Sequence, residues 1–414
     1  MNNAFSWVFI AAVALATATR LWLAQRQMRH VRAHRDAVPA MFAASIPLAA
    51  HQKAADYTVA KVRLGIVDTL LDAAILLALT LGGALQWLAD LWARAAPAES
   101  LWHGGALILT VFLLKGVLGL PLSVVRIFVI EERFGFNRMT WKLFLADLVK
   151  QLAVGAVLGV PLLLVVLWLT QVAGPLWWLY VWAVLVAYSL FLQMIYPAVV
   201  MPLFNKFSPL TDPVLAGRVE QLLQRTGFRS RGLYVMDGSK RSSHGNAFFA
   251  GFGAAKRIVL FDTLVSRLQP AEVEAVLAHE LGHYTLRHIV KGMALSWGFS
   301  FVLLLALGLL AGQPWFYQGL GMHTATLPVA LLLFMLAAPE FTFFLQPLLS
   351  LLARKNEYEA DRYAARNADA GELVRALVKL YHDNSATLTP DPLHSAYYDS
   401  HPPAATRIAR LRTT

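Results

Sequence analysis

The stretch AHELGHYTLRH, residues 278–288, is followed closely by the apolar run MALSWGFSFVLLLALGLLAG, residues 293–312. The first stretch places His279 and His283 four residues apart with Glu280 beside the first histidine, a pattern typical of a metal site on a helix. The second is long enough to cross a lipid bilayer as a helix. Together they predict a metal-binding helix that leads directly into a membrane span.

Apolar runs of this length recur along the chain. Hydrophobic residues make up 57% of the 414 residues and charged residues only 15%, which is far from the balance of a soluble protein. Because a helix satisfies its own backbone hydrogen bonds, each run of about 20 apolar residues is expected to cross the membrane as a helix. We predict about seven spans, near residues 4–24, 64–89, 102–125, 152–172, 176–200, 292–312 and 327–351. The fold class is therefore a mainly α, multi-pass membrane protein.

Basic residues are concentrated beside the predicted spans. The formal net charge is +11, and dense basic stretches at 25–35 and 133–142 follow the first and third spans. Since basic loops favour the cytosolic side of a membrane, we predict that the N-terminus lies outside. The segments predicted to be cytosolic are the loops 25–63, 126–151 and 201–291 and the C-terminal tail. This topology explains the basic excess, so nucleic acid is not expected as a partner.

A polar region, residues 202–291, separates the fifth and sixth predicted spans. Residues 202–213 are interpreted as an entry loop, and 214–227 show helical periodicity ending at Gly227. The segments 232–239 and 257–265 are predicted strands, and 246–257 predicts a hairpin turning at Gly251 and Gly253. Pro270 and Glu272 suit the first turn of the helix that carries the two histidines. We therefore divide the chain into 1–201 with five spans, an α+β unit at 202–291, two spans at 292–351, and a C-terminal region at 352–414.

The histidine pair supplies two ligands of a predicted metal site. Residues four apart on a helix lie one turn above each other, so His279 and His283 present their imidazoles on one face. Glu280 lies beside the metal without binding it, where it can take a proton from a metal-bound water. The chain has no cysteine, so a zinc site must be completed by histidine or carboxylate.

Three residues compete for the third ligand position. His288 is rotated well away from the shared face, and His401 lies in a proline-flanked loop, where ligands are positioned less rigidly. Glu357, in NEYEADRYAA at 356–365, is the better candidate because a helix would hold it. Asp361 shares the helix face of Glu357 and can accept a hydrogen bond from the outer nitrogen of a ligating histidine, whereas Glu359 points nearly opposite.

Several further motifs occur in the same order as in a known family. They are YPAVVMPLFNKFSPL at 196–210, SSHGNAFFAGF at 242–252, RIVLFDTL at 257–264, AHELGHY at 278–284, NEYEADRYA at 356–364, and YYDSHPP at 397–403 with Arg407. The set resembles the type I CAAX prenyl protease family of multi-span zinc metalloendopeptidases and covers nearly the whole chain. The resemblance implies seven helices around a water-filled intramembrane chamber, with a gluzincin-like zinc-protease unit at its cytosolic end.

The resemblance also implies roles for individual residues. It assigns one Zn²⁺ per chain to His279, His283 and Glu357, with Glu280 as general base. It places His401 and Arg407 near the active site, where His401 would donate to the developing oxyanion. It assigns substrate binding to Asn246, at the start of a strand whose edge a peptide can join, and Arg407 is likewise taken as a substrate-binding residue.

The predicted function is zinc-dependent hydrolysis of peptide bonds within the membrane. The substrate would be a CAAX-type prenylated protein, cleaved near its C-terminus, or another membrane-associated peptide, with membrane lipid as a further partner. The host is predicted to be a bacterial inner membrane or a membrane of the endoplasmic-reticulum type. The alternatives are a quality-control protease or binding scaffold without prenyl specificity, and a transporter with a structural metal site. Four ionisable residues at span depth, which either line a wet interior or pair with each other, are Asp68, Asp72, Lys115 and Glu340.

Overall fold

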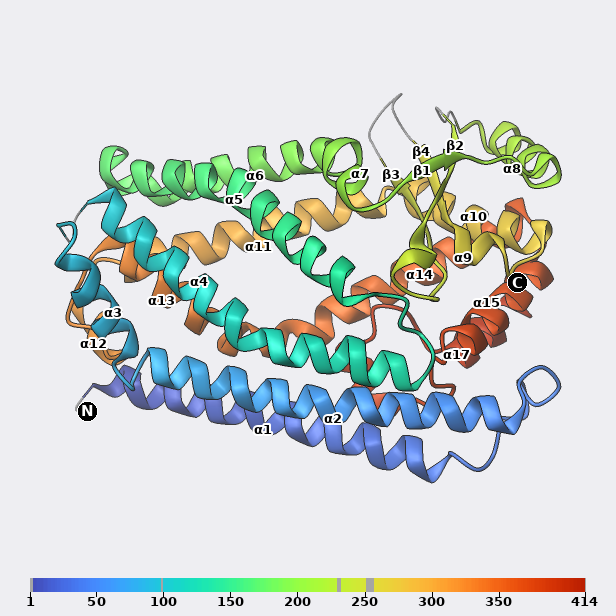
Figure 1. Ribbon diagram of the computed structural model, residues 1–414, viewed down its shortest axis with the longest axis horizontal. Coiled ribbons are helices and arrows are strands. Elements are labelled where there is room, and N and C mark those ends of the chain that lie inside the picture. The colour runs from blue at the N-terminus through green and yellow to red at the C-terminus, as the bar shows by residue number, and fades with distance from the viewer. Residues whose placement is uncertain (1–2, 98–99, 229–231, 251–256, 414) are drawn as a thin grey trace.

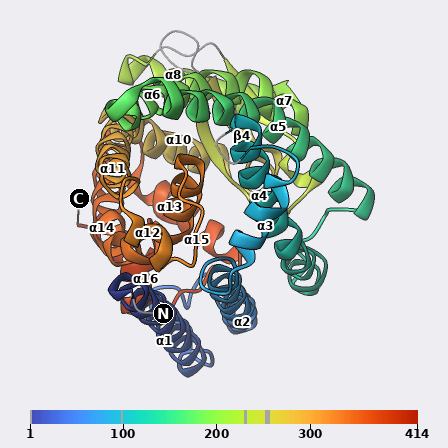
Figure 2. The ribbon, with the colours of Figure 1, turned by 90° about the vertical axis from the view of Figure 1, so that its left-hand side faces the viewer.

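Long helices dominate the structure, which is a computed structural model describing residues 3–97, 100–228, 232–250 and 257–413. They run along the long axis of the molecule (Figure 1), and the end-on view shows them arranged around a common centre (Figure 2). The long helices are α1 (Ala4–Ala33), α2 (Leu48–Leu79), α4 (Leu101–Val124), α5 (Trp141–Val172), α6 (Trp177–Ile195), α11 (His288–Leu310), α13 (Leu327–Thr342) and α14 (Gln346–Asn367). The prediction of a mainly α, multi-pass membrane fold is confirmed, whereas the water-filled chamber stays a prediction.

Six helical runs in the described chain are long and apolar enough to cross a membrane, and a bent helix pair brings the number to seven. The six are Ala4–Ala33, Leu101–Glu131, Trp141–Val172, Gly174–Phe204, His288–Leu310 and Leu327–Asn367. Two of these runs contain a π-helical segment, η1 (Val125–Glu131) and η3 (Tyr196–Val200). Large apolar side chains on the spans face outward, such as Val157 at 71% exposed and Leu309 at 68%. This exposure fits contact with lipid chains rather than water.

The predicted span 64–89 is wrong as a single helix. Helix α2 ends at Leu79, and α3 (Ala84–Ala93) leaves at an angle of 51°. Gly83 adopts φ of 76°, a left-handed conformation that ends a helix and is open mainly to glycine. The predicted span 327–351 is also interrupted, by a 3₁₀ turn at Phe343–Leu345, after which α14 continues to Asn367. The predicted domain boundary at 351–352 therefore falls inside α14.

Three of the four ionisable residues predicted at span depth have an ion-pair partner. Arg20 and Glu340 form an ion pair of 2.7 Å between α1 and α13. Lys115 and Asp72 lie 3.7 Å apart on α4 and α2. Structural pairing therefore describes Glu340, whereas the Lys115 and Asp72 side chains are 40% and 64% exposed, so their pair also fits a wet interior.

A four-stranded sheet lies at the end of the molecule that also holds the C-terminus (Figure 1). Its strands are β1 (Phe207–Pro209), β2 (Leu233–Met236), β3 (Ala247–Ala250) and β4 (Arg257–Phe261), in the order β1-β2-β4-β3. Strands β3 and β4 pair antiparallel, which confirms the hairpin, although Gly251 and Gly253 lie outside the described residues. The entry loop predicted at 202–213 is wrong in part, because β1 pairs antiparallel with β2.

Helices α8 (Pro213–Thr226) and α10 (Pro270–Thr285) cover one face of the sheet. Gly227 ends α8 as predicted, and α10 begins at Pro270 with a capping box between Gln269 and Glu272. The core between them is apolar and includes Ile258, Leu260, Val219 and Val273, each at most 1% exposed. Leu373, Ala376 and Leu411 belong to the same core. They come from α15 (Ala370–Asp383) and α17 (Ala404–Leu411), so the α+β unit and the C-terminal region pack together.

Candidate metal centre

Helix α10 brings the two motif histidines together. The Nε2 atoms of His279 and His283 are 3.2 Å apart, as expected for residues one helical turn apart. His279 is buried, with 6% of its surface exposed. Both metal-facing nitrogens therefore point at one small volume.

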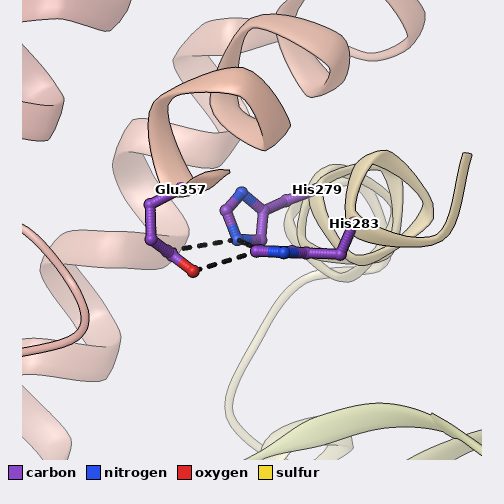
Figure 3. A group of neighbouring side chains, drawn as sticks. All are labelled: His279, His283 and Glu357. Carbon is purple, nitrogen blue, oxygen red and sulfur yellow. Dashed lines mark hydrogen bonds and ion pairs between the residues drawn. The ribbon is translucent and has the colours of Figure 1, made fainter. Parts of the chain in front are cut away.

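Glu357 of α14 reaches the same volume from the opposite side (Figure 3). Its Oε1 lies 3.1 Å from Nε2 of His283, and its Oε2 lies 3.5 Å from Nε2 of His279. Ligand atoms of the three residues all lie within 4.8 Å of one another. The structure thus brings together the three residues predicted as ligands, from two helices that have α11, α12 and α13 between them in the chain.

The geometry of this group fits a zinc ion. Tetrahedral zinc with ligands at about 2.1 Å holds neighbouring ligand atoms about 3.4 Å apart, close to the separations of 3.1–3.5 Å found here. Oε2 of Glu357 is buried and makes no hydrogen bond of regular geometry, although Nδ1 of His401 lies 2.8 Å away. A buried carboxylate oxygen needs a partner, and a cation between the three side chains would supply it.

A close helix contact fixes the distance between the two sources of ligands. Gly282, between the two histidines in α10, packs against α14, and a Cβ there would lie 2.9 Å from Cα of Ala360. Real Cβ atoms do not approach backbone so closely. Glycine at this position therefore allows α10 and α14 to come near enough for Glu357 to face the histidines.

His279 is held from behind by a buried carboxylate and an arginine. Its Nδ1 lies 2.9 Å from Oδ1 of Asp361, and Arg407 donates two hydrogen bonds to the same carboxylate, of 2.9 and 2.6 Å. Burial lowers the pKa of His279, but hydrogen bonds to Asp361 and Glu357 outweigh it and raise the pKa to about 9. The two carboxylates that raise this pKa also place negative charge beside the position a cation would take.

Arg407 occupies a different environment from the one expected of a substrate-binding residue. It is 6% exposed, and its guanidinium is engaged by Asp361, with Nη1 3.5 Å from Oε2 of Glu357. This placement favours support of the ligands rather than contact with a substrate.

His283 has an outer partner that the sequence did not indicate. Nδ1 of His288 lies 3.2 Å from Nδ1 of His283, and Nε2 of His288 lies 3.1 Å from Oε2 of Glu359. The chain reverses at Arg287, whose φ is 57°, so His288 begins a new helix instead of continuing α10. The prediction that His288 lies away from the histidine pair is therefore wrong. His288 is nevertheless not one of the three grouped ligands.

Glu280 and His401 lie around the metal group. Burial raises the pKa of the Glu280 carboxyl, and the charges of both motif histidines oppose that rise. Such a carboxylate is a better proton acceptor than an exposed one. His401 is 64% exposed and reaches Glu357 from the segment before α17, so its free surface is open to a substrate.

Asn246 immediately precedes the edge strand of the sheet. Strand β3 pairs with β4 on one side, is the last in the strand order, and packs near α10. The amide oxygen of Asn246 accepts a hydrogen bond from the backbone of Ala247, and its carbonyl oxygen accepts one from Phe261. The loop before it is fixed by Asn384, which accepts from the backbone of Gly245.

Comparisons with known proteins agree with this architecture. Residues 27–206 match the family model described as CAAX prenyl protease N-terminal, five membrane helices, and residues 209–414 match peptidase family M48. The CAAX prenyl protease 1 homolog of Arabidopsis thaliana is 35% identical, over 83% of this chain and 82% of its own. CAAX prenyl protease 1 of Saccharomyces cerevisiae is 36% identical, over 72% of this chain and 69% of its own.

A solved structure shares nearly the whole fold. The crystal structure of S. mikatae Ste24p superposes with a TM-score of 0.93 at 30% identity, covering 99% of this chain and 100% of that chain. Membrane helices joined to an M48 peptidase region define a membrane-embedded metalloendopeptidase. More particularly, the chain belongs to the CAAX prenyl protease family. The predicted fold, family and enzyme class are therefore confirmed.

Proposed function

We propose that this chain holds one zinc ion between His279, His283 and Glu357 and hydrolyses peptide bonds of CAAX-type prenylated proteins near their C-terminus. The convergence of three ligand atoms from α10 and α14 carries the proposal. The names of the similar proteins support the substrate class, since each is a CAAX prenyl protease or its homolog. The basic loops beside the spans support a cytosol-facing metal centre.

Each residue around the metal would have a separate role in peptide hydrolysis. A bound zinc ion supplies a Lewis acid and a water of lowered pKa. Glu280 would take the proton of that water and pass it to the leaving amine. His401, with its exposed ring, would donate a hydrogen bond to the developing oxyanion. The edge of β3 opposite β4, beginning after Asn246, would hold the substrate in an extended conformation through main-chain hydrogen bonds.

The proposed activity is tested with two peptides of identical sequence, one farnesylated and one not, each assayed with and without a chelator. We expect the farnesylated peptide to be cleaved faster, and cleavage to stop with the chelator and return when zinc is added. Cleavage that persists in the chelator would contradict the metal assignment. Equal rates for the two peptides would favour the alternative of a protease without prenyl specificity.

We further propose that His288 and Glu359 position the second ligand. Nδ1 of His283 contacts Nδ1 of His288 at 3.2 Å, and Nε2 of His288 contacts Oε2 of Glu359 at 3.1 Å. In our proposal Nδ1–H of His283 donates to His288, and Nε2–H of His288 donates to Glu359. This tautomer leaves Nε2 of His283 free to bind metal, the usual function of an outer hydrogen-bond partner.

Replacing His288 with alanine should weaken zinc binding by about 10- to 100-fold, because His283 would lose the partner that fixes its ring. The affinity is measured by competition with a chromophoric chelator. His288→Gln, which keeps an acceptor for His283, should recover part of the loss. A zinc affinity unchanged in both variants would show that His288 has no positioning role.

A further inference from the structure

The motif YPAVVMPLFNKFSPL, residues 196–210, takes no part in the metal centre. It forms the π-helical end of the span Gly174–Phe204, the short helix α7 (Met201–Phe204) and strand β1. Together with β2 and β4 it lines a cavity of about 530 Å³. The cavity therefore lies where a membrane span ends and the sheet begins.

Two cations stand at this cavity without carboxylate partners. Lys206 and Arg257 line it and are exposed, and neither forms an ion pair with any side chain in the described part of the chain. The guanidinium of Arg257 lies over the ring of Tyr234, 5.4 Å from its centroid. The carboxylate of Asp237 accepts a hydrogen bond from the backbone of Lys206, at 2.7 Å. The segments 229–231 and 251–256 contain no Asp or Glu.

The remaining walls of the cavity are largely apolar. Met201, Phe207 and Val259 line it beside the two cations. The adjoining end of the span carries exposed apolar side chains, including Met194 at 66% and Leu203 at 47%. A ligand that fits both features has an anionic head and a hydrocarbon tail.

We propose that this cavity binds the phosphate of an anionic phospholipid, with the acyl chains lying along the end of α6. Lys206 and Arg257 contact the phosphate, and the arginine fork is suited to two of its oxygens. Charge complementarity selects this occupant, because two cations with no carboxylate partner attract an anion and the exposed apolar helix end holds its tails. Occupancy ties the sheet that carries β3 to the membrane surface.

The test is a lipid titration of the full-length protein in detergent, followed by native mass spectrometry. The lipids are short-chain phosphatidylglycerol and phosphatidylcholine, and inorganic phosphate is a third arm. We expect phosphatidylglycerol to bind on the order of 10-fold more tightly than phosphatidylcholine. The double variant Lys206→Gln/Arg257→Gln should lose this preference, while Arg257→Lys in the otherwise unchanged chain should keep most of it.

A matched control removes two other exposed cations next to spans, Arg63 and Lys142, each replaced with glutamine. This control should keep the preference for phosphatidylglycerol and have the same melting temperature as the Lys206/Arg257 double variant. If both double variants lost the preference for phosphatidylglycerol equally, the preference would depend only on the net positive charge of the protein, and the proposed site would be overturned. Inorganic phosphate that displaces phosphatidylglycerol at millimolar concentration would assign the cavity to free phosphate and overturn the lipid assignment.

Discussion

Replacing Glu280 with glutamine is expected to lower the turnover number by about 10²- to 10⁴-fold, the usual contribution of a general acid-base group. Glutamine keeps the size of the side chain but could not accept a proton from the attacking water. Glu280 is not among the grouped ligands, so the metal content of the variant should be unchanged. The measurements are turnover on the farnesylated peptide and elemental analysis of the purified protein.

Glu220→Gln is the control for this variant, because Glu220 is an exposed residue of α8 and has no part in the centre. It should keep wild-type turnover. Peptidase activity near the wild-type rate in Glu280→Gln would show that another group acts as the base. Loss of metal from that variant would show instead that Glu280 supports the ligand set.

Replacing Glu357, the proposed third ligand, should lower peptidase activity further than Glu280→Gln does, because the zinc ion itself should be lost. In Glu357→Ala the cation would keep only the two imidazoles of His279 and His283, and water would have to replace the buried carboxylate. Loss of an outer partner alone costs about 10- to 100-fold in affinity, so loss of a ligand is expected to cost more. We expect purified Glu357→Ala to contain almost no zinc after dialysis and to have no peptidase activity above background.

Arg362→Ala provides the comparison on the same helix, because Arg362 is exposed. The Arg362→Ala variant should retain one zinc ion per chain, measured by elemental analysis of protein purified in the same way. A full equivalent of zinc in Glu357→Ala would contradict the proposed ligand set and direct attention to another third ligand. A folded Glu357→Ala protein, shown by an unchanged elution volume, is required for the comparison.

The spans were predictable because they are recognised from hydropathy averaged over about 20 residues. Their breaks were not predictable because one or two residues determine where a helix stops. A window over 64–89 averages across Gly82 and Gly83, so it cannot register that α2 stops at Leu79. Strand β1 was missed because its local sequence resembles that of a turn. Its three residues include Ser208 and Pro209, which are typical of turns, and only pairing with β2 makes them a strand.

The candidate site was predictable where one helix determined it. His279 and His283 follow from helical spacing, and so does the shared face of Glu357 and Asp361, while Glu280 follows from its place beside the first histidine. His288 did not, because helical spacing assumes that α10 continues, whereas the left-handed residue Arg287 ends it. The approach of Glu359 to His288 depends on the packing of two helices far apart in sequence, which periodicity cannot reveal.

The division of the ligands between α10 and α14 has a consequence for the order of biosynthesis. Glu357 lies 74 positions after His283, and the chain between them contains α11 and α13, which belong to two of the helical runs long and apolar enough to cross a membrane. A ribosome that has made α10 has therefore produced two of the three proposed ligands. With the proposed ligand set, the nascent chain would have no peptidase activity until translation has passed α14 and Glu357 has joined the two histidines.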